Sequence, residues 1–294
     1  MRTEWYKVSL LFLFLVAIIG TLLRSFGFFS IPFEYSHLVH AHSHTAFQGW
    51  VYLLMFLLLT KTFLSEEQLK HRRYPLQFKI TVFIIFGILI SFAVQGYALY
   101  SILFSTLFQL LNYWFVASFL RDTRTNIQNT TNGTALRFIK AGLWFGVLST
   151  ILPYGIGILS AKGLNGTEAY RSLVYSFMHL QYNGWFLFIV LGLFYNYLDR
   201  KEIPYNKQRS KLFYRFFTLA VIPAISLSLL GMSFSKYLLP IAYLSALLLA
   251  VSMIYFVRSV PKNLLTYIRK ESRWFNLYFL VFLLSFALKL LLQC

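Results

Sequence analysis

Residues 79–95, KITVFIIFGILISFAVQ, decide the fold class, because Lys79 is the only charged residue in the segment. Similar apolar segments recur along the chain, so hydrophobic residues make up 58% of its 294 residues and charged residues only 12%. A soluble domain has about twice that charged fraction, whereas a helix of roughly 20 apolar residues crosses a bilayer core. These runs are too long and too continuously apolar for the strands of a membrane barrel. The sequence therefore predicts an all-α, polytopic transmembrane helix bundle.

Nine spans are expected from the positions of the apolar runs. They cover residues 8–23, 38–60, 79–95, 98–120, 139–159, 172–197, 213–230, 238–257 and 274–292. Alternate loops differ strongly in charge: 22 Lys and Arg residues lie on the side of the N-terminus and 4 on the other side. Because basic residues collect in cytoplasmic loops, the N-terminus is predicted to be cytoplasmic, in a plasma membrane of the bacterial inner-membrane type.

Charge and cysteine content exclude several classes of protein. The basic residues that give the net charge of +18 lie between apolar blocks. In that position they are expected to face anionic lipid rather than nucleic acid. The single cysteine, Cys294, rules out a disulfide framework and a CxxCH haem attachment. All nine acidic residues fall in loops or at span ends. A cation-coupled transporter usually buries a carboxylate at mid-membrane, so this distribution argues against one.

Histidines gather at the start of the second span, in SHLVHAHSHTAFQGW, residues 36–50. His37, His40 and His44 have the spacing i, i+3, i+7 and share one helix face, whereas His42 lies about 200° around the helix from His44. His44 is expected to point inward and His42 elsewhere, although the reverse arrangement also satisfies the geometry. A further histidine, His179, lies in the sixth span.

An internal repeat links the two spans. When residues 35–50 are placed over residues 170–185, six of sixteen positions are identical, and the shared core is His-x4-Gly-Trp. Both predicted spans run from outside to inside, with His44 and His179 at the same depth of about 10 Å. The sequence therefore predicts one membrane domain, 1–294, built from four-helix repeats over about 1–135 and 136–270, with a third beginning at 271–294.

Two imidazoles at one depth in related helices suit a shared buried metal, because a neutral imidazole in an apolar bundle needs partners for its ring nitrogens. The predicted ligands are His44 and His179, with His42, His40 and His37 as further candidates. Hydrogen-bonded packing of His179, and an interfacial histidine cluster without metal, remain open alternatives. The motif tryptophans, Trp50 and Trp185, either stack on a flat cofactor or pack in the core.

This pattern resembles the subunit I fold of the haem–copper oxidases, in which four-helix arcs carry histidines near the outer face of spans two and six. His42-Ser43-His44-x4-Gly49 is also similar to the His-Ala-His-x4-Gly signature of NnrS-type membrane proteins. The resemblance implies haem or copper as cofactor, His44 as a haem ligand and His179 as a copper ligand. Arg24 and Arg171, at the outer ends of spans one and six, would suit a haem propionate.

The chain departs from the oxidase pattern in two ways. Its seventh span has no histidine, and it ends before spans ten to twelve, so a C-terminally truncated frame is expected and proton pumping is not. Three functions remain: a haem- or copper-binding relative with a redox or nitric-oxide-related role, a metal or haem binding or transport protein without catalysis, and a structural or assembly protein. Any enzymatic role would be that of an oxidoreductase with an electron donor or a second membrane subunit as partner. The catalytic residues are not identified.

Overall fold

The computed structural model describes residues 4–124 and 133–293 of the chain. All regular elements in these two stretches are helices. The chain divides into two compact units, Met1–Asn129 and Thr130–Cys294. Each unit is described separately below as unit 1 and unit 2.

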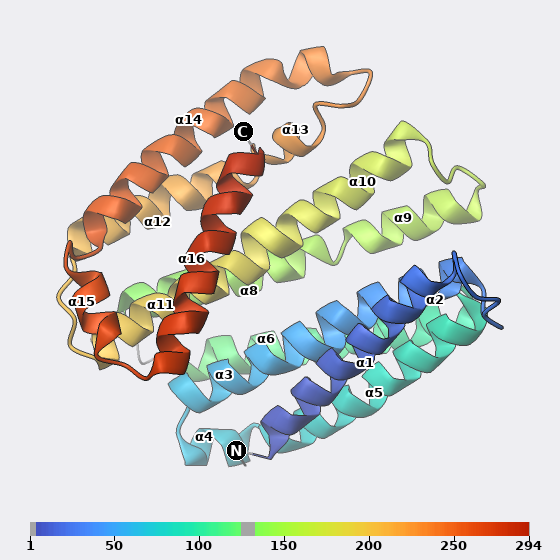
Figure 1. The fold of residues 1–294 in the computed structure, drawn as a ribbon, viewed down its shortest axis with the longest axis horizontal. Helices are drawn as coiled ribbons and strands as arrows, with labels where there is room; N and C mark the ends of the chain where they lie inside the picture. The colour runs from blue at the N-terminus through green and yellow to red at the C-terminus, as the bar shows by residue number, and fades with distance from the viewer. Residues whose placement is uncertain (1–3, 125–132, 294) are drawn as a thin grey trace. The chain divides into compact units, whose positions relative to one another are not determined.

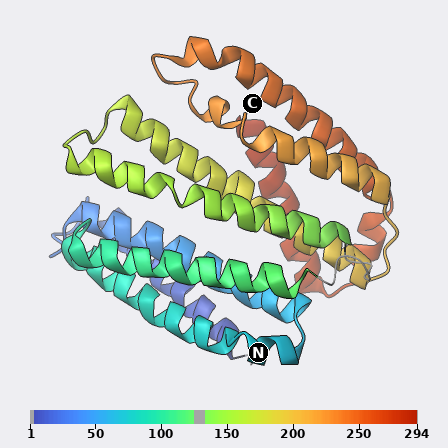
Figure 2. The ribbon, with the colours of Figure 1, turned by 180° about the vertical axis from the view of Figure 1, so that it is seen from behind.

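Unit 1 contains four rods of membrane-spanning length, with a short amphipathic helix between the second and third (Figure 1). α1 packs along the second rod, which consists of α2, η1 and α3, and α5 packs against α2 and α6. Figure 2 shows α5 and α6 as an antiparallel pair. The elements of unit 1 are α1 (Trp5–Ser25), α2 (Tyr35–His44), η1 (Thr45–Tyr52), α3 (Leu53–Phe63), α4 (Glu66–His71), α5 (Tyr74–Gln95) and α6 (Leu99–Asp122).

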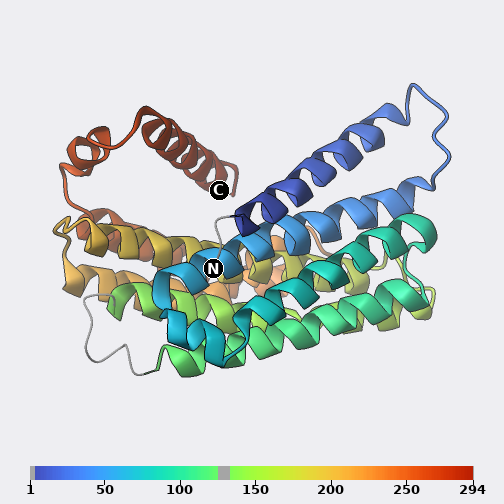
Figure 3. The ribbon, with the colours of Figure 1, turned by 90° about the horizontal axis from the view of Figure 1, so that it is seen from below.

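Unit 2 begins with α8 and α9, which are followed by a continuous rod of α10, η2 and α11. α8 packs against η2 and α11, and α12 packs against α14; α15 and α16 lie apart from the α12–α14 pair (Figure 3). Pro153 lies at the start of α9, directly after a helix break at residues 150–151. The elements of unit 2 are α8 (Gly133–Ser149), α9 (Leu152–Ala161), α10 (Glu168–His179), η2 (Leu180–Phe186), α11 (Leu187–Arg200), α12 (Lys207–Val221), α13 (Ile225–Ser228), α14 (Ser235–Ser259), α15 (Leu264–Arg269) and α16 (Arg273–Gln293).

Seven helices of the described chain are long and apolar enough to cross a membrane. They coincide with expected spans one to six and eight. Many large apolar side chains on them face outward; Phe14 is 62% exposed and Phe83 is 71% exposed. Aqueous solvent disfavours such extensive apolar exposure. The helices therefore indicate a lipid bilayer environment and a membrane protein.

The seventh expected span, residues 213–230, is not one continuous helix. α12 ends at Val221 and α13 covers only Ile225–Ser228. Pro223 has no N–H to donate within the helix and its ring obstructs the preceding turn. The N–H of Ile225 donates to the carbonyl of Ile222 at 3.1 Å instead of to that of Val221. The ninth expected span coincides with α16, which is outside the set of seven.

The start of the α16 segment is attached to α11 by a polar cluster. Glu271 accepts a hydrogen bond from the Tyr197 hydroxyl at 3.3 Å and pairs with Lys201 Nζ at 2.5 Å. The hydrogen bond from Lys201 and its positive charge hold the pKa of Glu271 below its ordinary value. The rings of Tyr197 and Phe275 stack with their centroids 5.4 Å apart. These contacts place the start of α16 beside the end of α11.

Asp122, the last residue of α6, joins the connection between α4 and α5 to the core of unit 1. Its Oδ1 accepts from Arg72 Nε at 3.1 Å, and its Oδ2 accepts from the Tyr74 hydroxyl at 2.9 Å. The Tyr74 side chain is completely buried, so its hydroxyl depends on this partner. A buried hydroxyl without a partner is unfavourable.

Replacing Asp122 with alanine is therefore expected to lower the free energy of unfolding by about 2–3 kcal/mol, because a buried hydroxyl and a guanidinium lose their acceptor. Thermal unfolding of the detergent-purified protein measures the change. Glu67→Ala, which removes an exposed carboxylate on the neighbouring α4, is the matched control and should leave the unfolding temperature nearly unchanged. Equal unfolding temperatures for the two variants would contradict the role given to Asp122.

Candidate functional site

His37, His40 and His44 lie along one face of α2, opposite the turn between α5 and α6. The His44 ring stacks on Phe92 with 4.2 Å between centroids, and its Nε2 lies 3.0 Å from the Tyr97 hydroxyl. The edge of the same tyrosine meets the His40 ring at 4.5 Å. His37 lies against Gly96 at the end of α5. Three imidazoles of one helix face are thus gathered around a single turn.

Gly96 is required at this turn for two reasons. Its φ of +61° lies in the left-handed region, which disfavours side chains. A Cβ atom at this position would also overlap the ring of His37. The glycine therefore lets the chain reverse between α5 and α6 and lets the histidine approach the backbone.

His42 contacts a different helix from His44. Its Nδ1 lies 3.1 Å from the main-chain carbonyl of Val16 on α1, and because a carbonyl only accepts, Nδ1 carries the proton. Gly20 makes room for this ring, since a Cβ there would lie 3.0 Å from His42 Cε1. The Arg24 guanidinium lies 3.9 Å from the same Cβ position. Arg24 is thus on the His42 side of the helix.

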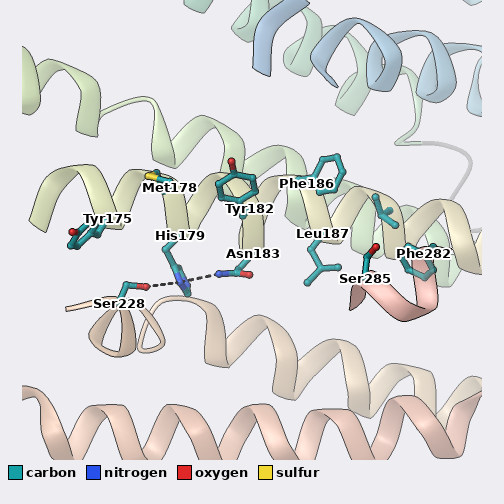
Figure 4. A pocket seen from close by; sticks show the side chains of 11 residues that line it. Tyr175, Met178, His179, Tyr182, Asn183, Phe186, Leu187, Ser228, Phe282 and Ser285 are labelled. Atoms are coloured by element: carbon teal, nitrogen blue, oxygen red, sulfur yellow. Dashed lines mark hydrogen bonds between the residues drawn. The ribbon is translucent and has the colours of Figure 1, made fainter. Parts of the chain in front are cut away.

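The unit 2 histidine, His179, is buried at the end of α10. Its Nε2 donates to the Val221 carbonyl at 2.9 Å, which is the group that the helix break after α12 exposes. Its Nδ1 therefore accepts, from Asn183 Nδ2 at 3.1 Å, with the Ser228 hydroxyl at 3.5 Å (Figure 4). With Nε2 as donor and Nδ1 as acceptor, these contacts select one tautomer of the ring.

This ring borders a cavity of about 520 Å³ within unit 2. Tyr175, Met178 and Tyr182 line the cavity from α10 and η2, and Ser285 lines it from α16. Figure 4 shows His179 directed toward Ser228, on the lower side of this space. The cavity combines one imidazole and several hydroxyl groups with largely apolar walls, as small-molecule and cofactor sites do.

Both histidine motifs run directly into π-helical segments. η1 follows His44 and contains Gly49 and Trp50, and η2 follows His179 and contains Gly184 and Trp185. Each glycine lies against a phenylalanine of the helix that starts the unit: a Cβ on Gly49 would lie 2.7 Å from Phe12 Cδ1, and one on Gly184 would lie 2.7 Å from Phe145 Cβ. π-helical turns are rare and are frequent at functional sites.

The two tryptophans and Arg171 do not line the cavity. Trp185 is buried against α8, where a Cβ on Gly146 would lie 2.7 Å from Trp185 Cδ1. The main-chain carbonyl of Trp50 accepts from the Ser9 hydroxyl at 3.0 Å. Arg171 is exposed in the first turn of α10. The structure thus assigns Trp185 to the packing between α8 and η2.

In the described stretches, no three His, Cys, Asp or Glu side chains are grouped so as to hold a metal. His44 and His179 belong to different units, so their meeting at one ion stays a prediction. Each unit contributes one imidazole next to a π-helical segment. A neutral imidazole nitrogen is a good ligand for copper or for haem iron.

Several neighbours of these histidines were not predicted from the sequence. Tyr97 and Phe92 flank His44, and the signal that could have found the tyrosine is the Gly96-Tyr97 turn at the same predicted end as the histidine cluster. Ser228 reaches His179 only because the helix breaks, and Pro223 was the available signal for that break. Tyr175 and Tyr182 lie about one turn before and after His179 in the sequence, and both line the cavity.

Comparisons of the chain with models of protein families, with curated proteins and with solved structures find no match. The functional interpretation therefore depends on the geometry within each unit and on the sequence pattern that the two units share.

Proposed function

We propose that the chain is an integral membrane protein that binds haem or copper through His44 and His179, one histidine from each unit, as in relatives of the oxidase subunit I fold. The observation that carries this proposal is the paired local geometry. In each unit a histidine ends an α-helix, a π-helical segment follows, and the motif glycine lies against the unit's first long helix. Haem iron or copper bound there would supply one-electron redox chemistry or nitric oxide binding.

The proposal includes an internal four-helix repeat, which further contacts support. Phe12 and Phe145 meet the two motif glycines, and they are 133 residues apart. Ser9 and Gly142 are also 133 residues apart, and each contacts the main-chain carbonyl of its motif tryptophan. The Ser9 hydroxyl lies 3.0 Å from the Trp50 carbonyl oxygen. A Cβ on Gly142 would lie 3.0 Å from the Trp185 carbonyl oxygen. One offset thus relates two independent contacts.

His179 has the hydrogen bonding expected of a metal ligand. Histidines that bind metals usually donate their other ring N–H to a carboxylate or a main-chain carbonyl, which fixes the tautomer. His179 donates from Nε2 to Val221, and Nδ1 is its acceptor nitrogen. Metal binding at Nδ1 would require that the Asn183 amide and the Ser228 hydroxyl move aside. The Val221 carbonyl would keep the ring oriented.

The proposed topology has a cytoplasmic N-terminus, so that the unit 1 histidines face outward, and it predicts where labels react. The Glu67→Cys substitution, in a Cys294→Ser background, is expected to give a cysteine that does not react with a membrane-impermeant thiol reagent in intact cells. This cysteine should react after permeabilisation. A cysteine at Gly163, in the loop after α9, is the control and should react in intact cells. Labelling in the opposite order would contradict the orientation.

Cofactor binding is tested with detergent-purified, metal-depleted protein titrated separately with haemin and with copper(II). The proposal predicts saturable binding of one of them, weakened in His44→Ala and in His179→Ala. Saturable haemin binding would produce a Soret band. Absence of saturable binding of either cofactor would contradict the proposal.

A second candidate function is metal collection by unit 1 alone, without catalysis. It is favoured by the positions of the His40 and His44 rings against Tyr97 and of His37 against the neighbouring Gly96, because all these rings belong to one unit. It predicts copper or zinc binding without a Soret band. That binding would be lost in His37→Ala or His40→Ala and unchanged in His179→Ala, so the same titration separates the two functions.

A further inference from the structure

A basic cavity lies at the other end of unit 1 from the histidines. Its volume is about 400 Å³, and its walls come from the α4–α5 connection and the last turns of α6. Its lining residues are His71, Arg72, Arg73, Trp114, Ala117, Ser118 and Arg121, and none of these is acidic. The proposed cofactor site does not use this cavity.

One of the three arginines is already neutralised. Arg72 pairs with Asp122, whose second oxygen accepts from the Tyr74 hydroxyl. Asp122 is 8% exposed, and both of its oxygens are occupied within the described chain. Both oxygens of this carboxylate therefore bind Arg72 and Tyr74. Asp122 does not neutralise the charges of Arg73 and Arg121.

Arg73 and Arg121 form no ion pair with any carboxylate in the described residues. Arg73 also holds a φ of +54° as the residue before α5, a conformation that favours glycine. Glycine or asparagine would suit the backbone better there, so the backbone conformation alone does not favour arginine at this position. Arg73 and Arg121 approach the cavity from two different helix ends, as a clamp for an anion would.

The position of the cavity identifies the kind of anion. α5 begins at Tyr74 and α6 ends at Asp122, and both are helices of membrane-spanning length. The cavity thus lies where the spans leave the apolar core, at the level of lipid phosphates. Trp114, 39% exposed, adds an aromatic side chain of the kind enriched at membrane interfaces. Basic pockets between spans at this level suit anionic headgroups.

We propose that Arg73, Arg121 and His71 bind the phosphate group of an anionic lipid in this cavity, with Trp114 against the lipid's glycerol region. Guanidinium groups bind phosphate oxygens through charge-assisted, often bidentate hydrogen bonds. Zwitterionic lipids carry the same phosphate together with a cationic group, which the arginines would repel. The site therefore distinguishes phosphatidylglycerol from phosphatidylcholine.

The test measures binding of phosphatidylglycerol and of phosphatidylcholine to the full-length protein in a neutral detergent by native mass spectrometry. Arg73→Gln and Arg121→Gln are each expected to weaken phosphatidylglycerol binding about fivefold, and the double variant roughly twenty-five-fold. Lys70→Gln is the matched control, because Lys70 lies on the same connection outside the cavity lining, and it should change the affinity less than about twofold. Thermal unfolding verifies that each variant is folded.

Displacement of the lipid by millimolar inorganic phosphate would assign the site to phosphate anions in general. Retention of the lipid under the same conditions would assign it to the headgroup together with its acyl chains. Both results support a phosphate site. Equal binding of phosphatidylglycerol to the wild type and the folded double variant, or equal binding of both lipids to the wild type, would overturn the proposal.

Discussion

The His44→Ala variant is expected to lose its bound haem or copper. The imidazole of His44 lies between Phe92 and the Tyr97 hydroxyl, and no other side chain on this face of α2 occupies the same position. Removing a direct metal ligand is expected to reduce affinity by more than the 10–100-fold loss typical for the groups that orient ligands. Metal analysis and the absorption spectrum of the purified variant measure the loss.

His71→Ala is the control for this variant, because His71 is an exposed histidine in the same unit and lies in the basic cavity. It should retain the wild-type cofactor content. The unfolding temperature of metal-free His44→Ala should stay close to that of the metal-free wild type, so that loss of cofactor is separated from loss of fold. Full cofactor occupancy in folded His44→Ala would show that His44 is not a ligand of the cofactor.

Gly184→Ala is expected to destabilise unit 2. The added Cβ would lie 2.7 Å from Phe145 Cβ and 3.0 Å from its Cγ. The first of these atoms is fixed to the α8 backbone, so it moves only if the helices separate. Overpacking of this kind typically destabilises by about 1–3 kcal/mol, and the strain next to η2 should also displace His179. Thermal unfolding and the cofactor titration measure the two effects.

Gly157→Ala provides the comparison for this substitution. Gly157 is also a helical glycine of unit 2, in α9, but a Cβ there would meet no atom within 4 Å. Alanine favours the helical backbone over glycine by roughly 1 kcal/mol, so this variant should be neutral or slightly more stable. If Gly184→Ala and Gly157→Ala unfold at the same temperature, the close packing of η2 on α8 is not required for stability.

The helical membrane architecture could be predicted because it follows from composition and from the lengths of the apolar runs. Lys79 and Gln95 bound an apolar segment that coincides with most of α5, since a bilayer selects for length and hydrophobicity alone. The break within residues 213–230 was missed because hydropathy does not register one missing N–H. Pro223 changes the hydrogen bonding of the helix without changing its apolar character.

The neighbours of the histidines were harder to predict than the histidines themselves. His37, His40 and His44 follow from helical periodicity, which fixes their common face. The π-helical segments after His44 and His179 could not be predicted from periodicity. No distinctive residue type marks a π turn, because tertiary packing determines where it forms. The contact of His179 with Val221 likewise depends on a helix break in another part of the chain.

The optical spectrum and metal content of the wild-type protein, purified in mild detergent from cells supplied with haem and copper, test the account most directly. We expect either a Soret band with haem bound or copper present in a fixed ratio to protein, and we expect both signals to be absent in a folded His44→Ala, His179→Ala double variant. A colourless wild-type protein without bound copper, or a spectrum and copper content that the double variant leaves unchanged, would contradict it.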